Sequence, residues 1–138
     1  MKLDDQKIVQ AIAEAESQTS GEVRVHVTKF ASKNILEKSK IVFEKLGMAK
    51  TQERNGILFF IAEVSKCFSI LGDKGIHEKV HQEFWEELSA TMQDHFRKKE
   101  FTQGLCEAIR ECGEKLKLYF PYQRDDVDEL SNQVSRDS

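Results

Sequence analysis

Hydrophobic residues recur at two different periods along this chain, and the change of period predicts where helices give way to strands. Residues 3–17 carry apolar side chains at helical spacing, up to a polar break at residues 19–21. Residues 22–28 alternate strictly between valine and polar residues, which predicts a strand with one buried face and one face in solvent. A second helix is predicted after Ser32, which can cap it, and Gly47 can end it.

An unbroken apolar run marks the centre of the predicted sheet. Residues 56–62 contain no polar side chain, which is typical of a strand covered on both faces. Residues 67–71 are predicted to form a third strand, close enough in sequence to pair with this strand as an antiparallel hairpin. Two further amphipathic helices are predicted, one beginning near Ile76 and one beginning near Phe101.

Together these elements predict an α/β fold in a single domain, residues 1–121. A strand-helix-strand crossover makes the first two strands parallel, and the hairpin makes the third strand antiparallel. The predicted fold class is therefore a small mixed sheet of three to four strands, sandwiched between helices. The remaining residues, 122–138, are polar and acidic, and they are predicted to form a mobile C-terminal tail.

Composition and charge restrict the partners and the compartment. The 138 residues carry a formal net charge of -3, so nucleic acid, which normally selects a basic face, is not an expected partner. The three cysteines, Cys67, Cys106 and Cys112, form no C-x-x-C pair, which indicates buried thiols in a reducing compartment. The sequence shows neither a signal-peptide pattern nor a run of about 18 apolar residues, so we expect a soluble cytoplasmic protein without direct membrane insertion.

Three short polar motifs fall where the predicted strands begin or end. They occupy residues 19–22, 54–56 and 72–75. Because the first two strands are parallel and the third is antiparallel, all three motifs are expected at one edge of the sheet. The same edge receives the N-terminus of the helix near Ile76, whose free N–H groups favour anions or carboxylates.

This edge holds candidate ligands for a divalent cation. Asp73 and Glu22 supply carboxylates and Asn55 supplies a carbonyl oxygen, and oxygen ligands are those that calcium and magnesium prefer. Lys74 and Arg54 are candidates for holding a phosphoryl group beside such a metal. The competing interpretations are structural. Asp73 can cap the following helix, Glu22 can belong to a solvent-exposed strand face, and Asn55 can serve a turn.

The sequence HEKVH at residues 77–81 matches the H-E-x-x-H pattern, in which two histidines one helical turn apart bind zinc. The further ligand that such proteases require is not found at the expected distance, so a protease is not favoured. The interpretation we prefer is an exposed helix face, and a weak transition-metal site is the alternative.

His26 and His95 have no partner at ligand spacing, and no G-x-S-x-G nucleophile motif is present.

The motifs resemble those of the TPM domain, a family named for a thylakoid lumen protein, a photosystem II repair protein and a receptor modulator. The matching segments are TSGEVRVHV at 19–27, RNGILFF at 54–60, GDKGIHEKV at 72–80, GLCEAI at 104–109 and LYFP at 118–121. The resemblance implies a sheet between helices, divalent-cation binding reported for some members, and weak acid phosphatase activity ascribed to plastid members. Many relatives have a signal peptide and a C-terminal membrane anchor, which this sequence lacks, so their membrane-linked roles are not expected here.

Two functions remain open. The first is a binding module with a weak calcium or magnesium site that acts through a protein partner. The second is a low-efficiency, metal-assisted acid phosphatase at the same edge. The first is favoured because phosphoryl transfer needs several metal ligands, an activated nucleophile and charge stabilisation, of which the sequence supplies only parts. No organic cofactor is expected.

Overall fold

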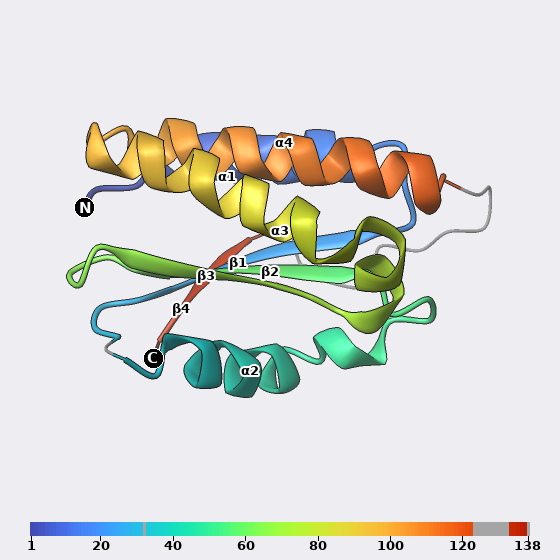
Figure 1. The fold of residues 1–138 in the computed structure, drawn as a ribbon, viewed down its shortest axis with the longest axis horizontal. Coiled ribbons are helices and arrows are strands. Elements are labelled where there is room, and N and C mark those ends of the chain that lie inside the picture. Colours follow the sequence, from blue (N-terminus) through green and yellow to red (C-terminus); the bar gives the residue numbers. More distant parts are fainter. Residues whose placement is uncertain (32, 123–132, 138) are drawn as a thin grey trace.

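The chain folds into three layers, with a sheet between two layers of helices (Figure 1). The structure is a computed structural model that describes residues 1–31, 33–122 and 133–137. The elements in chain order are α1 (Asp5–Glu16), β1 (Glu22–Thr28), α2 (Ile35–Lys45), the short 3-10 helix η1 (Met48–Lys50), β2 (Gly56–Ala62), β3 (Cys67–Gly72), α3 (Lys74–Arg97), α4 (Phe101–Tyr119) and β4 (Val134–Arg136). Helices α1, α3 and α4 cover one face of the sheet, and α2 covers the other (Figure 1).

The sheet is mixed and has the strand order β3-β2-β1-β4. Strands β1 and β2 are parallel, joined by the crossover through α2, whereas β2 and β3 form an antiparallel hairpin. The predicted fold class is therefore confirmed, and the sheet has four strands within the described residues.

Two hydrophobic cores hold the layers together. The larger core lies between the sheet and α1, α3 and α4, and β1 contributes Val23, Val25 and Val27 to it. The smaller core lies between the sheet and α2, and it includes Phe43, Met48 and Phe60. Every residue of β2 is buried, which confirms the prediction of a central strand covered on both faces.

The polar face of β1 is buried, although the alternating sequence predicted a solvent-exposed face. Glu22, His26 and Thr28 are only 2%, 6% and 8% exposed. The ring of His26 stacks on Phe60 with a centroid distance of 5.7 Å. The prediction was wrong because alternation shows only which side chains lie on the same face of the strand. Whether the polar face is exposed to water depends on the α2 layer and on the fourth strand, which cover it here.

The fourth strand comes from the segment predicted to be a tail. β4 pairs in parallel with β1, with His26 opposite Ser135, so residues 134–136 correct that prediction. Residues 123–132 and 138 of the predicted tail lie outside the described residues. Asp137 accepts a hydrogen bond from the Thr28 hydroxyl and contacts His26 Nε2 at 2.8 Å, and these two interactions hold the pKa of the Asp137 carboxyl below its usual value. The polar face of β1 thus supplies the partners that hold the end of the chain.

The helix ends agree in part with the sequence. Gly47 follows Leu46, the C-cap residue of α2, and adopts a φ of 72°, as expected for a glycine that ends a helix. The predicted cap Ser32 lies outside the described residues, and Asn34 occupies the cap position without a side-chain hydrogen bond.

Cys106 and Cys112 are buried and Cys67 is half-buried, and burial raises the pKa of all three thiols. None of the helices in the described ranges is long and apolar enough to cross a membrane.

The corner between α3 and α4 is fastened by His95. Its Nδ1 lies 3.1 Å from Glu100 Oε1 and its Nε2 lies 2.6 Å from Glu107 Oε2. Gly104 lies against this ring, because a Cβ there would meet His95 Cβ at 2.6 Å. Desolvation lowers the pKa of His95, but the two carboxylates raise it by more, so the folded chain favours the protonated imidazole.

We expect the contribution of His95 to stability to depend on pH. Because the folded state raises its pKa, the stabilisation is fully present below the ordinary histidine pKa of about 6.5 and is lost as pH rises through the folded value. His95→Gln should therefore lower the free energy of unfolding, measured with urea, more at pH 5.5 than at pH 9. In a chain that already carries Glu100→Gln and Glu107→Gln, this difference between the two pH values should largely disappear. An equal effect of His95→Gln at both pH values in the parent chain would contradict the prediction.

Candidate functional site

The three polar motifs meet where β1 and β2 begin. Glu22 pairs with Gly56 in the parallel register, and Ile57 pairs with Gly72 in the hairpin. The backbone N–H of Asp73 donates to the carbonyl oxygen of Gly56 at 2.9 Å. We call this region the Gly56 edge, defined by Ser20, Glu22, residues 53–56, Asp73 and Lys74. The main chain therefore brings together the segments that carry all five predicted site residues.

The Asp73 carboxylate accepts three hydrogen bonds at the Gly56 edge. It caps α3 by accepting from the N–H of Lys74 at 2.8 Å. The guanidinium of Arg54 donates to both carboxylate oxygens, Nε to Oδ2 at 2.6 Å and Nη2 to Oδ1 at 2.8 Å. This bidentate pair raises the pKa of the Arg54 guanidinium. The capping interpretation of Asp73 is therefore correct, and a divalent cation at Asp73 has to compete with Arg54.

The turn that carries Arg54 is packed directly against the start of α3. Arg54 has a φ of 53°, and its carbonyl oxygen accepts from the N–H of Gly75 at 2.8 Å. A Cβ on Gly75 would lie 2.2 Å from the carbonyl oxygen of Glu53. This close approach explains why a glycine follows Lys74, and the hydrogen bond from Gly75 to Arg54 links the second and third motifs.

Asn55 is buried at the centre of the Gly56 edge, with an exposed fraction of 1%. Its amide Nδ2 donates to Ser20 Oγ at 3.4 Å and to Glu53 Oε2 at 3.5 Å. The Ser20 hydroxyl also donates to Glu53 Oε2 at 2.8 Å. The side-chain oxygen Oδ1 of Asn55 is buried and accepts no hydrogen bond from the described part of the chain. A buried amide oxygen in this state is an available ligand position.

Ser20 and Glu53 are site residues that the sequence interpretation missed. Ser20 lies within the first motif and Glu53 directly precedes the second, so position in the sequence was the available signal. The loop containing Ser20 is fixed by the end of α4, because the Ser20 N–H donates to the carbonyl oxygen of Phe120 at 3.0 Å and Thr19 Oγ1 donates to that of Leu116 at 3.0 Å. The LYFP segment and the first motif are therefore parts of the same local structure.

The remaining predicted residues differ in their accessibility. Glu22 is 2% exposed, so the interpretation of it as a solvated strand residue is wrong. Lys74 is exposed beside the Asp73 cap. Within the described residues, no group of three or more histidine, cysteine, aspartate or glutamate side chains converges as metal ligands. Any cation at this edge would therefore depend on amide oxygens and water as well as on carboxylates.

The HEKVH segment does not form a regular turn of helix. His81, the second histidine, has φ 65° and ψ 174°, and α3 is kinked at this residue. His77 Nδ1 accepts a hydrogen bond from the indole Nε1 of Trp85 at 2.9 Å. The regular helix that presents two histidines to one metal in H-E-x-x-H proteins is therefore interrupted at the second histidine.

Comparison with known proteins finds a matching family profile and similar solved structures. A profile of the TPM domain matches residues 2–115 of the chain. The NMR structure of the BA42 protein from the psychrophilic bacterium Bizionia argentinensis sp. nov. is similar with a TM-score of 0.89 and 38% sequence identity, over 99% of this chain and 97% of that chain. No curated protein sequence matches. Both likenesses include every segment of the Gly56 edge.

Proposed function

The chain belongs to the TPM domain family, and from that premise we propose that it is a binding module that holds a divalent cation weakly at the Gly56 edge and acts through a protein partner. The observation that carries the proposal is the buried Oδ1 of Asn55, which has no hydrogen-bond donor among the described residues. An unsatisfied buried oxygen is unfavourable by about 1 to 3 kcal/mol, and a cation would relieve this.

The surrounding charges support a weak site for calcium or magnesium. Glu22 and Asp73 are buried carboxylates on the segments next to Asn55, being 2% and 7% exposed. Arg54 already neutralises Asp73 through two hydrogen bonds, so part of the Coulomb attraction for a cation is cancelled. Glu53 lies within hydrogen-bond distance of the Asn55 amide and adds a carboxylate to the candidate ligands. Action through a partner is proposed because this set provides ligand oxygens but few of the groups that catalysis requires.

The experiment is a titration with calcium and with magnesium, followed by backbone amide NMR signals. We expect the amide signals of Glu22, Asn55 and Asp73 to shift together and to saturate at one midpoint. Asn55→Ala should weaken the response about tenfold or more, because it removes the buried oxygen. Asn34→Ala is the matched control, since Asn34 makes no side-chain cap hydrogen bond. Shifts confined to residues 125–129 would show nonspecific attraction to the acidic segment, and the proposed site would be wrong.

The acid phosphatase is the second hypothesis, and one observation favours it. Arg54, Lys74 and the N-terminus of α3 lie beside the proposed cation position, and they are the groups that would hold a phosphoryl oxygen. Hydrolysis of p-nitrophenyl phosphate by the same metal-loaded sample separates the two functions. Metal binding without hydrolysis would leave the binding module and remove the phosphatase, whereas hydrolysis lost in Asn55→Ala and retained in Asn34→Ala would reverse this order.

A further inference from the structure

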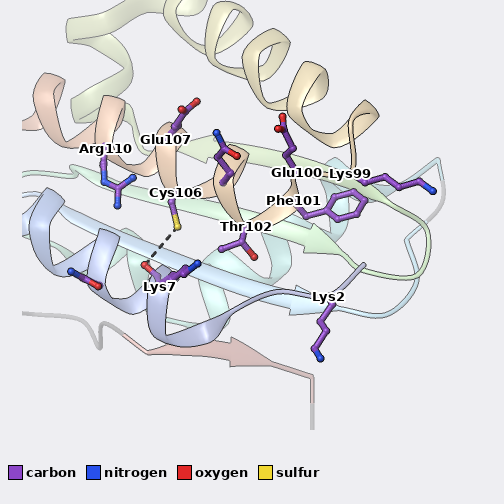
Figure 2. Close-up of a pocket in the computed structure, with 11 residues that line it drawn as sticks. Lys2, Lys7, Lys99, Glu100, Phe101, Thr102, Cys106, Glu107 and Arg110 are labelled. Atoms are coloured by element: carbon purple, nitrogen blue, oxygen red, sulfur yellow. Dashed lines mark hydrogen bonds between the residues drawn. The ribbon is translucent and has the colours of Figure 1, made fainter.

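A second candidate site lies between α1 and α4, at the corner where α4 begins (Figure 2). A cleft of about 720 Å³ opens there, within the range of about 300 to 1,000 Å³ common for small-molecule sites. We call it the α1–α4 cleft. Its lining residues are Lys2, Lys7, Gln10, Lys99, Glu100, Phe101, Thr102, Gln103, Cys106, Glu107 and Arg110.

The charge of this cleft is opposite to that of the whole chain. Four cationic side chains line it against two carboxylates, although the protein carries a formal net charge of -3. Both carboxylates, Glu100 and Glu107, bind the His95 ring at 3.1 and 2.6 Å. Figure 2 shows them on the side of α4 that faces α3, away from Lys7 and Thr102. Both carboxylates of the lining are therefore paired with His95, and the cationic side chains outnumber them.

The three lysines of the cleft, by contrast, are available to bind a ligand. Lys2, Lys7 and Lys99 are exposed, and none of them forms a side-chain ion pair within the described ranges. Arg110 is shared, because its Nε donates to Glu14 Oε2 at 3.2 Å. Lysine ammonium groups on a concave surface raise the local concentration of anions. They also bind phosphate oxygens as compact point charges.

The floor of the cleft is fixed by bonds between the two helices. Thr102 Oγ1 accepts from the N–H of Asp4 at 3.1 Å, so its own hydroxyl proton is available to a ligand. The Cys106 thiol donates to the carbonyl oxygen of Lys7 at 3.6 Å (Figure 2). The start of α4 adds N–H groups, since Glu100 at its cap position makes no side-chain cap hydrogen bond.

From these features we propose that the α1–α4 cleft binds a phosphate-bearing anion through Lys2, Lys7, Lys99 and the Thr102 hydroxyl. Its position on α1 and α4 is separate from the Gly56 edge, and its ligand has the opposite charge. The phosphate group is either free in a small molecule or part of a lipid headgroup, and the two sources share this recognition chemistry.

The test uses the full chain with two probes, pyrophosphate and vesicles that contain phosphatidic acid. Pyrophosphate should shift the amide signals of Lys7, Lys99 and residues 101–103. The double variant Lys7→Gln/Lys99→Gln should weaken binding about tenfold or more, because two charge-assisted contacts are lost. Lys29→Gln/Lys45→Gln removes the same charge at exposed lysines outside the cleft, and it should change the affinity by less than about twofold.

Each outcome decides the proposal. Pyrophosphate binding lost only in Lys7→Gln/Lys99→Gln supports a free phosphate ligand, and vesicle binding with the same dependence but no pyrophosphate response supports a lipid headgroup. Absence of binding to both probes overturns the proposal. Equal weakening in the two double variants also overturns it, because net charge alone would then explain the result. Urea unfolding of both variants checks that the comparison is between folded proteins.

Discussion

Replacing Gly75 with alanine is expected to lower the free energy of unfolding by about 3 kcal/mol, measured by urea denaturation. Gly75 lies in the first turn of α3, where alanine would ordinarily stabilise a helix by about 0.5 to 1 kcal/mol. The sign reverses here because the new Cβ would lie 2.2 Å from the Glu53 carbonyl oxygen and 2.6 Å from that of Arg54. Both atoms belong to the backbone, so the turn or the helix start has to move.

The neighbouring residue provides the control for this prediction. Lys74→Ala changes an exposed side chain in the same helical turn, and it should alter stability by less than about 0.5 kcal/mol. Gly75→Ala should also weaken the cation response at Asn55, because Asn55 follows directly on the displaced turn. A Gly75→Ala protein as stable as the parent would show that the turn and α3 are not packed as the structure describes.

The course of the central strands could be predicted because local sequence and burial agree there. Strand β2 has no polar side chain and is buried throughout, so the strand predicted from its sequence agrees with its place in the fold. Strand β1 shows the limit of this reasoning. Its valines face the larger core as the alternation predicts, yet His26 and Thr28 are also buried, since β4 arrives from more than 100 residues later in the chain.

The same distinction applies to the Gly56 edge. Crossover and hairpin rules brought residues 19–22, 54–56 and 72–75 to one edge, because these rules concern strand direction and need no side-chain detail. The Arg54–Asp73 pair could not be derived in this way. It is a side-chain contact between the turn before β2 and the α3 cap, and strand direction alone does not specify side-chain contacts. Glu53 was overlooked because, apart from its place directly before the second motif, nothing in the sequence distinguishes it from other surface acids.

Asp73→Ala is expected to lower the free energy of unfolding by about 2 kcal/mol and to abolish the cation response of the Gly56 edge. The lost helix cap alone accounts for about 1 to 2 kcal/mol. The substitution also leaves Arg54 without its carboxylate, so the edge gains a positive charge that repels calcium and magnesium. Urea denaturation measures the first effect, and the amide NMR titration measures the second.

Asp73→Asn is the matched variant that separates the cap from the charge. Asparagine caps helices about as well as aspartate, so it should retain the bond from the Lys74 N–H and lower the free energy of unfolding by less than about 1 kcal/mol. It removes the negative charge, however, and should weaken the cation response nearly as much as alanine does. If Asp73→Asn binds calcium and magnesium as well as the parent chain, the Asp73 carboxylate is not a cation ligand. The site would then rest on Glu22, Glu53 and the Asn55 oxygen.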